Sequence, residues 1–184
     1  MFFAQRDVVQ MDKMFFNAFT FNKDIGDWDT GKVKNMNAMF KKAALFNNNI
    51  GFWNTSKVEN MIEMFSEADS FNQDISPWNT SSVIYMSYMF YFAINFNQPI
   101  NSWNTSSLEK ATGMFHGAKS FDNELNNWDT SKVNSMTGMF RESGQFNSDI
   151  SKWDTSNVIA MSYMFKDASV FNQNLSDWCV ANIP

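Results

Sequence analysis

Residues 36–60 read MNAMFKKAALFNNNIGFWNTSKVEN, and the rest of the chain repeats this pattern. A period of about 20 to 50 residues is typical of proteins in which one supersecondary unit stacks on copies of itself. The sequence therefore predicts a repeat protein with a structural ladder of aromatic residues. Tryptophan marks the period without a slip, at Trp28, Trp53, Trp78, Trp103, Trp128, Trp153 and Trp178.

The repeat covers the whole chain, residues 1–184, and no linker or low-complexity segment interrupts it. We therefore expect a single domain. Its 20 phenylalanines and 44% hydrophobic residues are more than a disordered chain contains. The expected divisions are a partial unit 1–10 and then units 11–35, 36–60, 61–85, 86–110, 111–135, 136–160 and 161–184.

Within a unit, the spacing of apolar residues predicts secondary structure. Val33, Met36, Met39, Phe40 and Ala43 are separated by steps of 3, 3, 1 and 3 residues, which is typical of one face of an amphipathic helix. The Asn-Thr-Ser or Asp-Thr-Ser run upstream is a candidate N-cap for that helix. The Phe-Asn-x-x-Ile segment downstream suits a short strand and a turn. The expected fold is an α/β repeat, a solenoid of about seven units with one short helix and one short strand each.

Two polar ladders follow the lone phenylalanine of each unit. Stacked asparagine side chains can satisfy the backbone groups of turns, so the first ladder is predicted to be structural; it contains Asn22, Asn47, Asn72, Asn97, Asn147 and Asn172. Two residues further on lies a partly acidic row with Asp24, Asp74, Glu124 and Asp149. Oxygen-rich rows suit calcium, although Pro99 interrupts this one.

Two further ladders have alternative interpretations. An evenly spaced row of threonines from Thr30 to Thr155 can bind ice, but each threonine also fits a cap turn. Pairs such as Met36 and Met39 carry thioethers that can bind Cu(I). They lie on the apolar side of the expected helix, where methionine fills the core. We therefore expect no cofactor.

No set of residues predicts catalysis. The single histidine, His116, and the single cysteine, Cys179, fall in different units, and His116 occupies an ordinary exposed position of the expected helix. Glycine-rich phosphate loops and zinc-ligand spacing are absent. The net charge of −5 argues against a nucleic-acid partner, and no apolar run is long enough to span a membrane. We expect a protein that is not an enzyme.

The consensus W-D-T-S-x-V-x-N-M-x-x-M-F-x-x-A-x-x-F-N-x-D-I resembles the 25-residue repeat of BspA-like leucine-rich-repeat surface proteins. The resemblance extends from Met11 to Trp178. It implies a leucine-rich-repeat-like solenoid in a cell-surface or extracellular protein that serves in adhesion or interaction, and it supplies no catalytic residue. Residues 1–7 lack the basic start and apolar stretch of a signal peptide. If the protein is secreted, the sequence predicts N-glycosylation at Asn54, Asn79, Asn104 and Asn174.

The predicted function is a surface interaction or adhesion module that binds a protein or glycan partner. Its binding residues are expected where the units differ while the ladders stay constant. This candidate interaction face consists of Lys23, Asn48, Gln73, Gln98, Asn123, Ser148 and Gln173, with Asp24, Asp74, Glu124 and Asp149 beside them.

Two alternative functions remain open. The sequence starts and stops within a unit and has no polar cap, which predicts either a segment of a longer protein or head-to-tail self-association into filaments. The other alternative is calcium or ice binding through a polar ladder.

Overall fold

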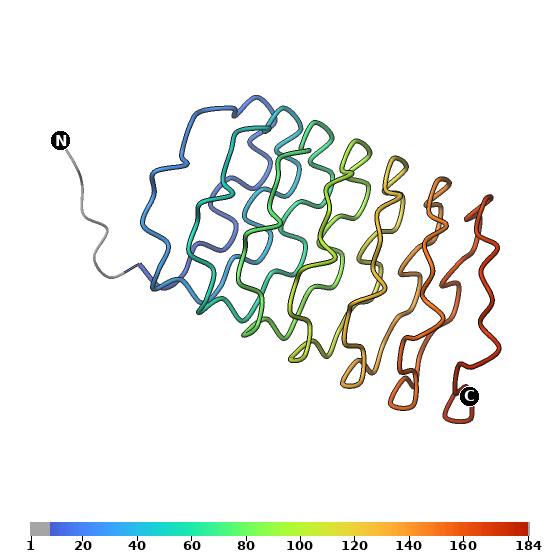
Figure 1. Cartoon of the computed structure of the whole chain (residues 1–184). Helices are drawn as coiled ribbons and strands as arrows, with labels where there is room; N and C mark the ends of the chain where they lie inside the picture. Colours follow the sequence, from blue (N-terminus) through green and yellow to red (C-terminus); the bar gives the residue numbers. More distant parts are fainter. Residues whose placement is uncertain (1–7, 184) are drawn as a thin grey trace.

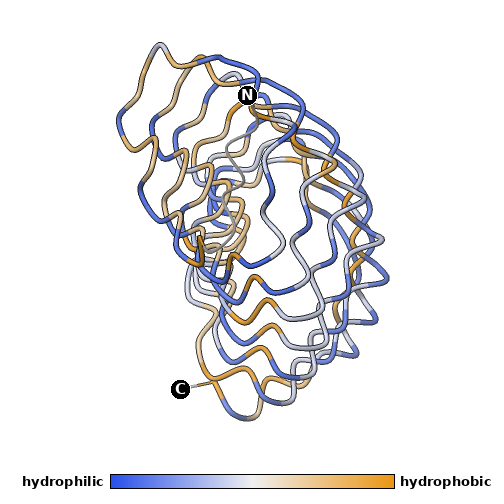
Figure 2. Ribbon diagram, turned by 90° about the vertical axis from the view of Figure 1, so that its left-hand side faces the viewer, coloured by the Kyte–Doolittle hydropathy of each residue, from blue (hydrophilic) through white to orange (hydrophobic). Residues whose placement is uncertain are grey.

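The computed structural model describes residues 8–183. The chain winds into a stack of coils, which run side by side from the first coil at one end to the last at the other (Figure 1). Seen along the stack, the coils lie over one another (Figure 2). Isolated parallel bridges hold them in register, and each joins residues 25 positions apart: Gln10 to Asn35, Asn35 to Asn60, Asn60 to Tyr85, Tyr85 to Lys110, Lys110 to Ser135 and Ser135 to Ala160.

The predicted helix and strand of each unit do not form. Over residues 8–183 the chain contains turns and isolated bridges, but no helix and no extended strand. The expectation of an α/β leucine-rich-repeat-like solenoid is therefore wrong. The Asn-Thr-Ser run caps no helix either. Instead, Asn54 Oδ1 accepts the N–H of Ser56 at 3.1 Å and closes an Asx turn.

Left-handed backbone conformations explain why no helix forms. The angle φ is +51° at Ala38 and +62° at Lys42, within the segment that was expected to be helical. A helix needs right-handed dihedral angles at every residue. Steps of 3 and 1 between apolar residues fit a chain that turns every four residues as well as they fit a helix. The same two positions are left-handed in other coils, at Lys13, Asn17, Glu63, Glu67, Tyr88, Phe92, Gly113, Gly117, Gly138, Glu142, Tyr163 and Asp167.

This backbone directs every second N–H group to the next coil. The N–H groups of Met36, Ala38, Phe40 and Lys42 donate to carbonyls of the following coil at 2.8–2.9 Å. The residues between them donate within their own coil, as Met39 N–H does to Met36 O at 3.2 Å. In an α-helix all these bonds would stay within the helix. The left-handed conformation costs about 1–2 kcal/mol per residue, and the hydrogen bonds between coils, each worth about 1 kcal/mol net, offset part of it.

Aromatic ladders fill the interior of the stack. Phe40 stacks on Phe46 of its own coil with ring centroids 4.1 Å apart, and on Phe65 of the next coil at 5.6 Å. Trp103 stacks on Trp128 at 6.4 Å, and its Nε1–H donates to Ile75 O at 3.0 Å. The indole therefore adds apolar contact and also satisfies a buried carbonyl. The same donation is made by Trp53, Trp78, Trp128, Trp153 and Trp178.

Polar ladders connect the coils in the same way. Asn47 Oδ1 accepts the N–H of Asn72, and Asn72 Oδ1 accepts the N–H of Asn97, both at 2.9 Å. The row continues through Asn22, Asn147 and Asn172. Thr80 is 1% exposed and its hydroxyl donates to Asn104 O at 2.9 Å. The threonine hydroxyls therefore point into the stack and satisfy carbonyls.

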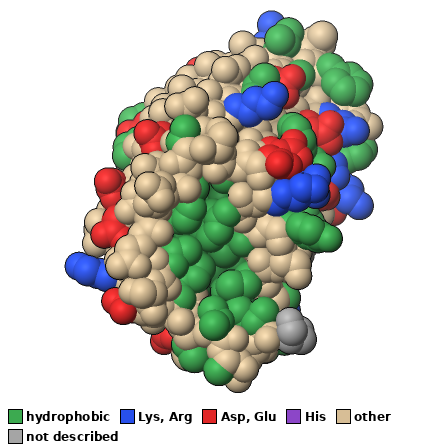
Figure 3. Space-filling view, turned by 90° about the vertical axis from the view of Figure 1, so that its right-hand side faces the viewer, with side chains coloured by type: hydrophobic (Ala, Val, Ile, Leu, Met, Phe, Trp, Pro, Cys, Tyr) green, Lys and Arg blue, Asp and Glu red, His purple; other side chains and the backbone are tan. Residues whose placement is uncertain are grey.

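The last described coil leaves an apolar surface uncovered. Figure 3 shows hydrophobic side chains gathered in the middle of this end of the stack. A cavity of about 520 Å³ lies there, lined by Met161, Tyr163, Met164, Phe165, Lys166, Leu175, Trp178 and Val180. Residues 8–183 contain no helix that could span a bilayer.

Replacing Gly138 by alanine tests the importance of the left-handed positions. Gly138 has a φ of +59°, and the nearest atom to an added Cβ is Arg141 Cβ at 3.9 Å, so alanine brings backbone strain without a clash. We expect Gly138→Ala to lower the free energy of unfolding by about 1 kcal/mol in urea denaturation. Gly144 is the matched control, because its φ is not left-handed and its added Cβ has room. Gly144→Ala should be neutral or slightly stabilising, and equal losses in both variants would contradict the argument.

Candidate functional site

One surface of the stack differs strongly from coil to coil. It is formed by the positions of Tyr88, Tyr91, Phe92 and Ile94 and by the equivalent residues of the other coils, and we call it the variable face. These residues alternate along the chain with buried ones such as Met89. The left-handed turns thus point core residues inward and variable residues outward. Equivalents of Tyr91, for example, are Phe16, Lys41, Ser66, His116, Arg141 and Lys166.

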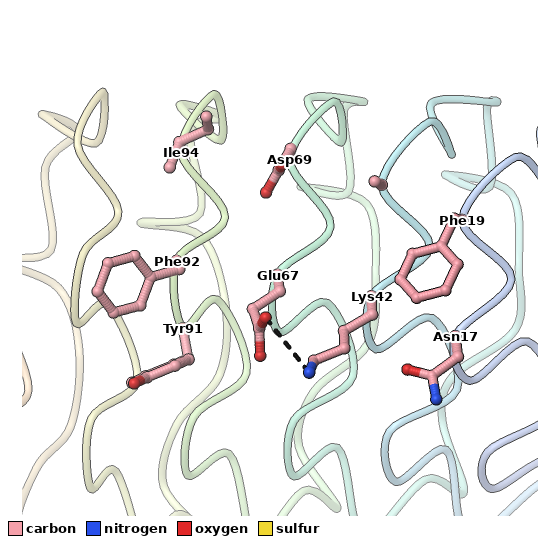
Figure 4. Close-up of a pocket in the computed structure, with 9 residues that line it drawn as sticks. Asn17, Phe19, Lys42, Glu67, Asp69, Tyr91, Phe92 and Ile94 are labelled. Carbon is pink, nitrogen blue, oxygen red and sulfur yellow. Dashed lines mark ion pairs between the residues drawn. The ribbon is translucent and has the colours of Figure 1, made fainter.

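The largest cavity described lies on the variable face. It has a volume of about 770 Å³ and crosses four neighbouring coils. Figure 4 shows the rings of Phe19 and Phe92 at opposite ends, with Lys42 and Glu67 between them. Phe19 is 56% exposed, which is unusual for a residue of this type. The groove is lined by Asn17, Phe19, Lys42, Ala44, Glu67, Asp69, Tyr91, Phe92 and Ile94.

Charges in the groove are arranged in pairs. Lys42 Nζ lies 3.6 Å from Glu67 Oε2, and both side chains are 39% exposed, so solvent screens this pair. Lys41 and Glu63 form a closer pair beside it. Burial, followed by the negative charge of Glu67, raises the pKa of Asp69. These pairs add little to fold stability, but they fix the side chains that line the groove.

Two smaller cavities lie on either side of Tyr91. The first, of about 280 Å³, is lined by Lys41, Glu63, Ser66, Glu67, Tyr88 and Tyr91. The second, of about 270 Å³, is lined by Tyr88, Tyr91, Gly113, His116, Thr137, Gly138, Arg141 and Tyr163. Tyr91 also lines the large groove, so this one side chain is shared by all three cavities.

Tyr91 is the centre of an aromatic cluster. Its ring packs edge-on against Tyr88 at 5.8 Å, Phe92 at 4.7 Å and His116 at 4.9 Å. The two buried side-chain polar atoms of the described residues that have no hydrogen-bond partner, Ser66 Oγ and His116 Nε2, line the cavities beside it. Such atoms are rare in folded proteins.

Burial controls the protonation of His116. Its side chain is 14% exposed, and Nε2 lies 3.4 Å from Glu142 Oε1. Burial lowers the pKa of His116, the Glu142 carboxylate raises it by a smaller amount, and Arg141 lowers it again. The ring is therefore neutral at pH 7 and can accept or donate a hydrogen bond. The expectation of an ordinary exposed position is wrong for this residue.

Comparison with known proteins identifies the family of the chain. The family model described as "Mycoplasma protein of unknown function, DUF285" matches residues 9–125 and 95–184. The chain belongs to this family. Neither the curated proteins nor the solved structures contain a match. The two overlapping matches agree with a repeat protein, and the family description states no activity.

The interaction face predicted from the sequence lies on a different segment of the DUF285 coils. Many of its side chains are hydrogen-bonded within the stack: Gln73 Nε2 donates to Asn47 Oδ1 at 3.0 Å, and Gln98 Nε2 to Asn72 Oδ1 at 2.9 Å. Similar bonds to the preceding coil are made by Asn48, Asn123, Ser148 and Gln173. The structure places these residues in one row and uses their polar groups to link coils.

The acidic row beside them closes turns. Asp74 Oδ1 accepts the N–H of Ser76 at 2.9 Å, and Asp24 and Asp149 accept from the residues two positions on. The hydroxyl and then the N–H of Ser151 lower the pKa of Asp149. No group of three His, Cys, Asp or Glu side chains that could hold a metal ion exists within the part of the chain that is described. The predicted glycosylation positions, Asn54, Asn79, Asn104 and Asn174, are exposed.

Sequence reasoning missed the variable face because it assigned these residues to the outer side of a helix. The positions of the glycines in the sequence do indicate that the helix is absent. Gly113, Gly117 and Gly138, three of the seven glycines in this DUF285 chain, fall at the two left-handed positions. Glycine within an expected helix is unfavourable, and its return at two fixed positions argues against that helix.

The single histidine allows a direct test of the burial of this surface. We expect NMR titration of the His116 ring protons to give a pKa below 6.5, and Glu142→Gln to lower it further by removing the carboxylate. Because the unfolded chain then takes up the proton first, the free energy of unfolding should fall as pH drops below about 6.5. His116→Gln should remove this part of the pH dependence. A folded-state pKa at or above 6.5 would contradict the burial of the ring.

Proposed function

We propose that this protein is a non-enzymatic interaction module that binds a protein or glycan partner through the variable face. The observation that carries the proposal is the clustering of three cavities on the variable face, with Tyr91 common to all of them. Aromatic side chains in partly dehydrated pockets dominate the energy of many interfaces. The regular ladders below hold these residues in place.

The resemblance to BspA-like surface proteins supports a location at the cell surface and a role in adhesion. The face predicted from the sequence, from Lys23 to Gln173, is the competing surface. We favour the variable face because the amides of Gln73 and Gln98 are already engaged between coils, whereas Phe19 and Tyr88 are exposed.

A matched pair of triple variants tests the proposal. The groove variant removes an aromatic, a cation and a tyrosine from the large cavity: Phe19→Ala, Lys42→Ala and Tyr91→Ala. The control variant removes the same residue types from positions outside the three cavities: Phe52→Ala, Lys23→Ala and Tyr85→Ala. Phe52 is 86% exposed and Tyr85 is 37% exposed, so their loss leaves the core intact.

We expect the labelled wild-type chain to bind at least one immobilised glycan or purified surface protein on a defined array. The groove variant should lose at least about tenfold in affinity, since aromatic anchors carry most binding energy, while the control variant should retain it. Loss of binding in the control variant alone would overturn the assignment of the site to the variable face. Binding by neither wild-type nor control would overturn the proposal.

End-to-end assembly is a second candidate function, favoured by the complementary ends of the stack. In the last described coil, the N–H groups of Met161, Tyr163, Phe165 and Asp167 have no partner among residues 8–183. The equivalent acceptors at the other end are carbonyl groups of the first coil. Among residues 8–183 no backbone N–H donates to the carbonyls of Gln10, Asp12, Met14 and Phe16. A second copy could therefore continue the register across apolar surfaces.

Sedimentation over a concentration series tests this assembly. We expect the 184-residue chain to form longer particles as its concentration rises, and Val180→Lys to reduce their growth because Val180 lines the apolar end and is 58% exposed. Phe52→Lys, on another surface, is the control. A monomer at every concentration would exclude end-to-end assembly.

A further inference from the structure

We propose that Tyr91 and the two small cavities beside it form a binding site for a neutral oligosaccharide of at least two pyranose rings. This inference rests on the proposed function and names the ligand class of one part of the variable face. Its starting point is Ser66 Oγ, which is buried without a partner, and His116 Nε2, which makes no hydrogen bond and has the Glu142 carboxylate as a neighbour at 3.4 Å. Nearly every other polar ladder in the stack is satisfied by the neighbouring coil.

The chemistry of these atoms favours hydroxyl groups. A serine hydroxyl and a neutral imidazole nitrogen can each donate or accept a hydrogen bond, and a sugar hydroxyl can do the same. Ser66 lines one cavity and His116 lines the other. Both atoms are buried, and Tyr91 is half-buried and lines both cavities. The proposed site therefore requires the Tyr91 ring to rotate away from them, and side-chain rotation of surface residues is fast.

The spacing of these atoms favours two sugar rings. Ser66, Tyr91 and His116 occupy the same position in three successive coils. The phenylalanines that precede them are spaced at 5.8 Å from Phe65 to Phe90 and at 5.6 Å from Phe90 to Phe115. Positions two coils apart are therefore separated by about 11 Å, the sum of these two steps. Such a distance matches a disaccharide with its linkage over Tyr91.

Tyrosine rings and glycines give the second cavity the shape of a slot. Tyr88 and Tyr163 are exposed walls, the Tyr88 ring covers Gly113, and Gly138 contributes no side chain. The Tyr88 ring lies so close to Gly113 that an added Cβ would be 2.5 Å from it. Aromatic faces pack well against the C–H face of a pyranose, and Gly138, where an added Cβ would meet nothing closer than 3.9 Å, leaves space beside the tyrosine rings.

Charge and backbone pairing favour a neutral sugar over a peptide. Arg141 Nε lies 3.1 Å from Glu142 Oε1, so the cation at the edge of the slot is already compensated. Gly113 N–H donates to Thr137 O at 2.8 Å, and Gly138 N–H donates to Ser162 O at 2.9 Å. An extended peptide that added to this surface as a strand would find these backbone donors occupied.

Titration of ¹⁵N-labelled chain with cellotriose, maltotriose, lactose and N,N′-diacetylchitobiose tests the site. We expect at least one sugar to give saturable amide shifts around Ser66, Tyr91 and His116. Tyr91→Ala should weaken binding at least about tenfold, because it removes the stacking platform. Tyr85→Ala, an exposed tyrosine outside the cavities, should leave it unchanged. Shifts that persist equally in Tyr91→Ala would overturn the assignment.

Ser66→Ala separates ligand binding from packing. Loss of a buried hydroxyl that has no partner should leave the urea midpoint of the chain unchanged or raise it. The same change should weaken sugar binding about three- to tenfold, since one hydrogen bond to the ligand is lost. A Ser66→Ala chain that binds the sugars as tightly as wild-type would contradict the role of this serine.

The same titrations distinguish failure of this inference from failure of the proposed function. No shift with any sugar up to about 20 mM, a limit that corresponds to negligible affinity, would overturn the oligosaccharide site. The oligosaccharide site would also be overturned if amide shifts around Tyr91 were produced by a pool of unrelated decapeptides and by none of the sugars. If the groove variant still loses binding to a protein on the array, the interaction module stands without its sugar site.

Discussion

The backbone hydrogen bonds between coils are the constraint on which the rest of this structure depends. They exist because left-handed residues such as Ala38 and Lys42 turn every second peptide group toward the neighbouring coil. In an α-helix those N–H groups would donate within the helix. Neighbouring coils would then be held together by side-chain contacts alone. Here the backbone sets the register, and the side-chain ladders follow from it because equivalent residues are brought into contact.

This constraint divides the residues of a coil into two groups. Phe40, Phe46 and Trp53 stack on their own equivalents, so a change in one coil affects the neighbours on both sides. The residues of the variable face alternate with core residues and point outward. Residues at the positions of Tyr91 and Phe92 can therefore differ freely, and a site can be built on them without loss of the fold. This separation of scaffold and site is the physical basis for the interaction function that we propose.

The sequence was sufficient for the 25-residue period and for a repeat protein, because tryptophan and the other constant residues recur at a fixed interval. It was not sufficient for secondary structure. The steps between Met36, Met39, Phe40 and Ala43 fit both a helix and a chain of tight turns, and only the recurring glycines at Gly113 and Gly138 favoured the turns. The candidate site was missed for the same reason, because its residues were assigned to the outer side of a helix.

Repetition also explains why unsatisfied polar atoms are informative in this molecule. A polar group that recurs in every coil finds its partner in the next copy, as the hydroxyl of Thr80 and the amide of Asn72 do. Ser66 and His116 stand at a position where neighbouring coils carry different side chains, so no identical residue lies beside them to pair with. Their hydrogen bonds are not specified by the stack. Within the repeat, Ser66 Oγ has no partner and His116 Nε2 has only the Glu142 carboxylate at 3.4 Å, outside hydrogen-bond geometry. Both atoms can therefore bind solvent or a ligand, and the tyrosines around them favour a ligand with an apolar face and several hydroxyl groups.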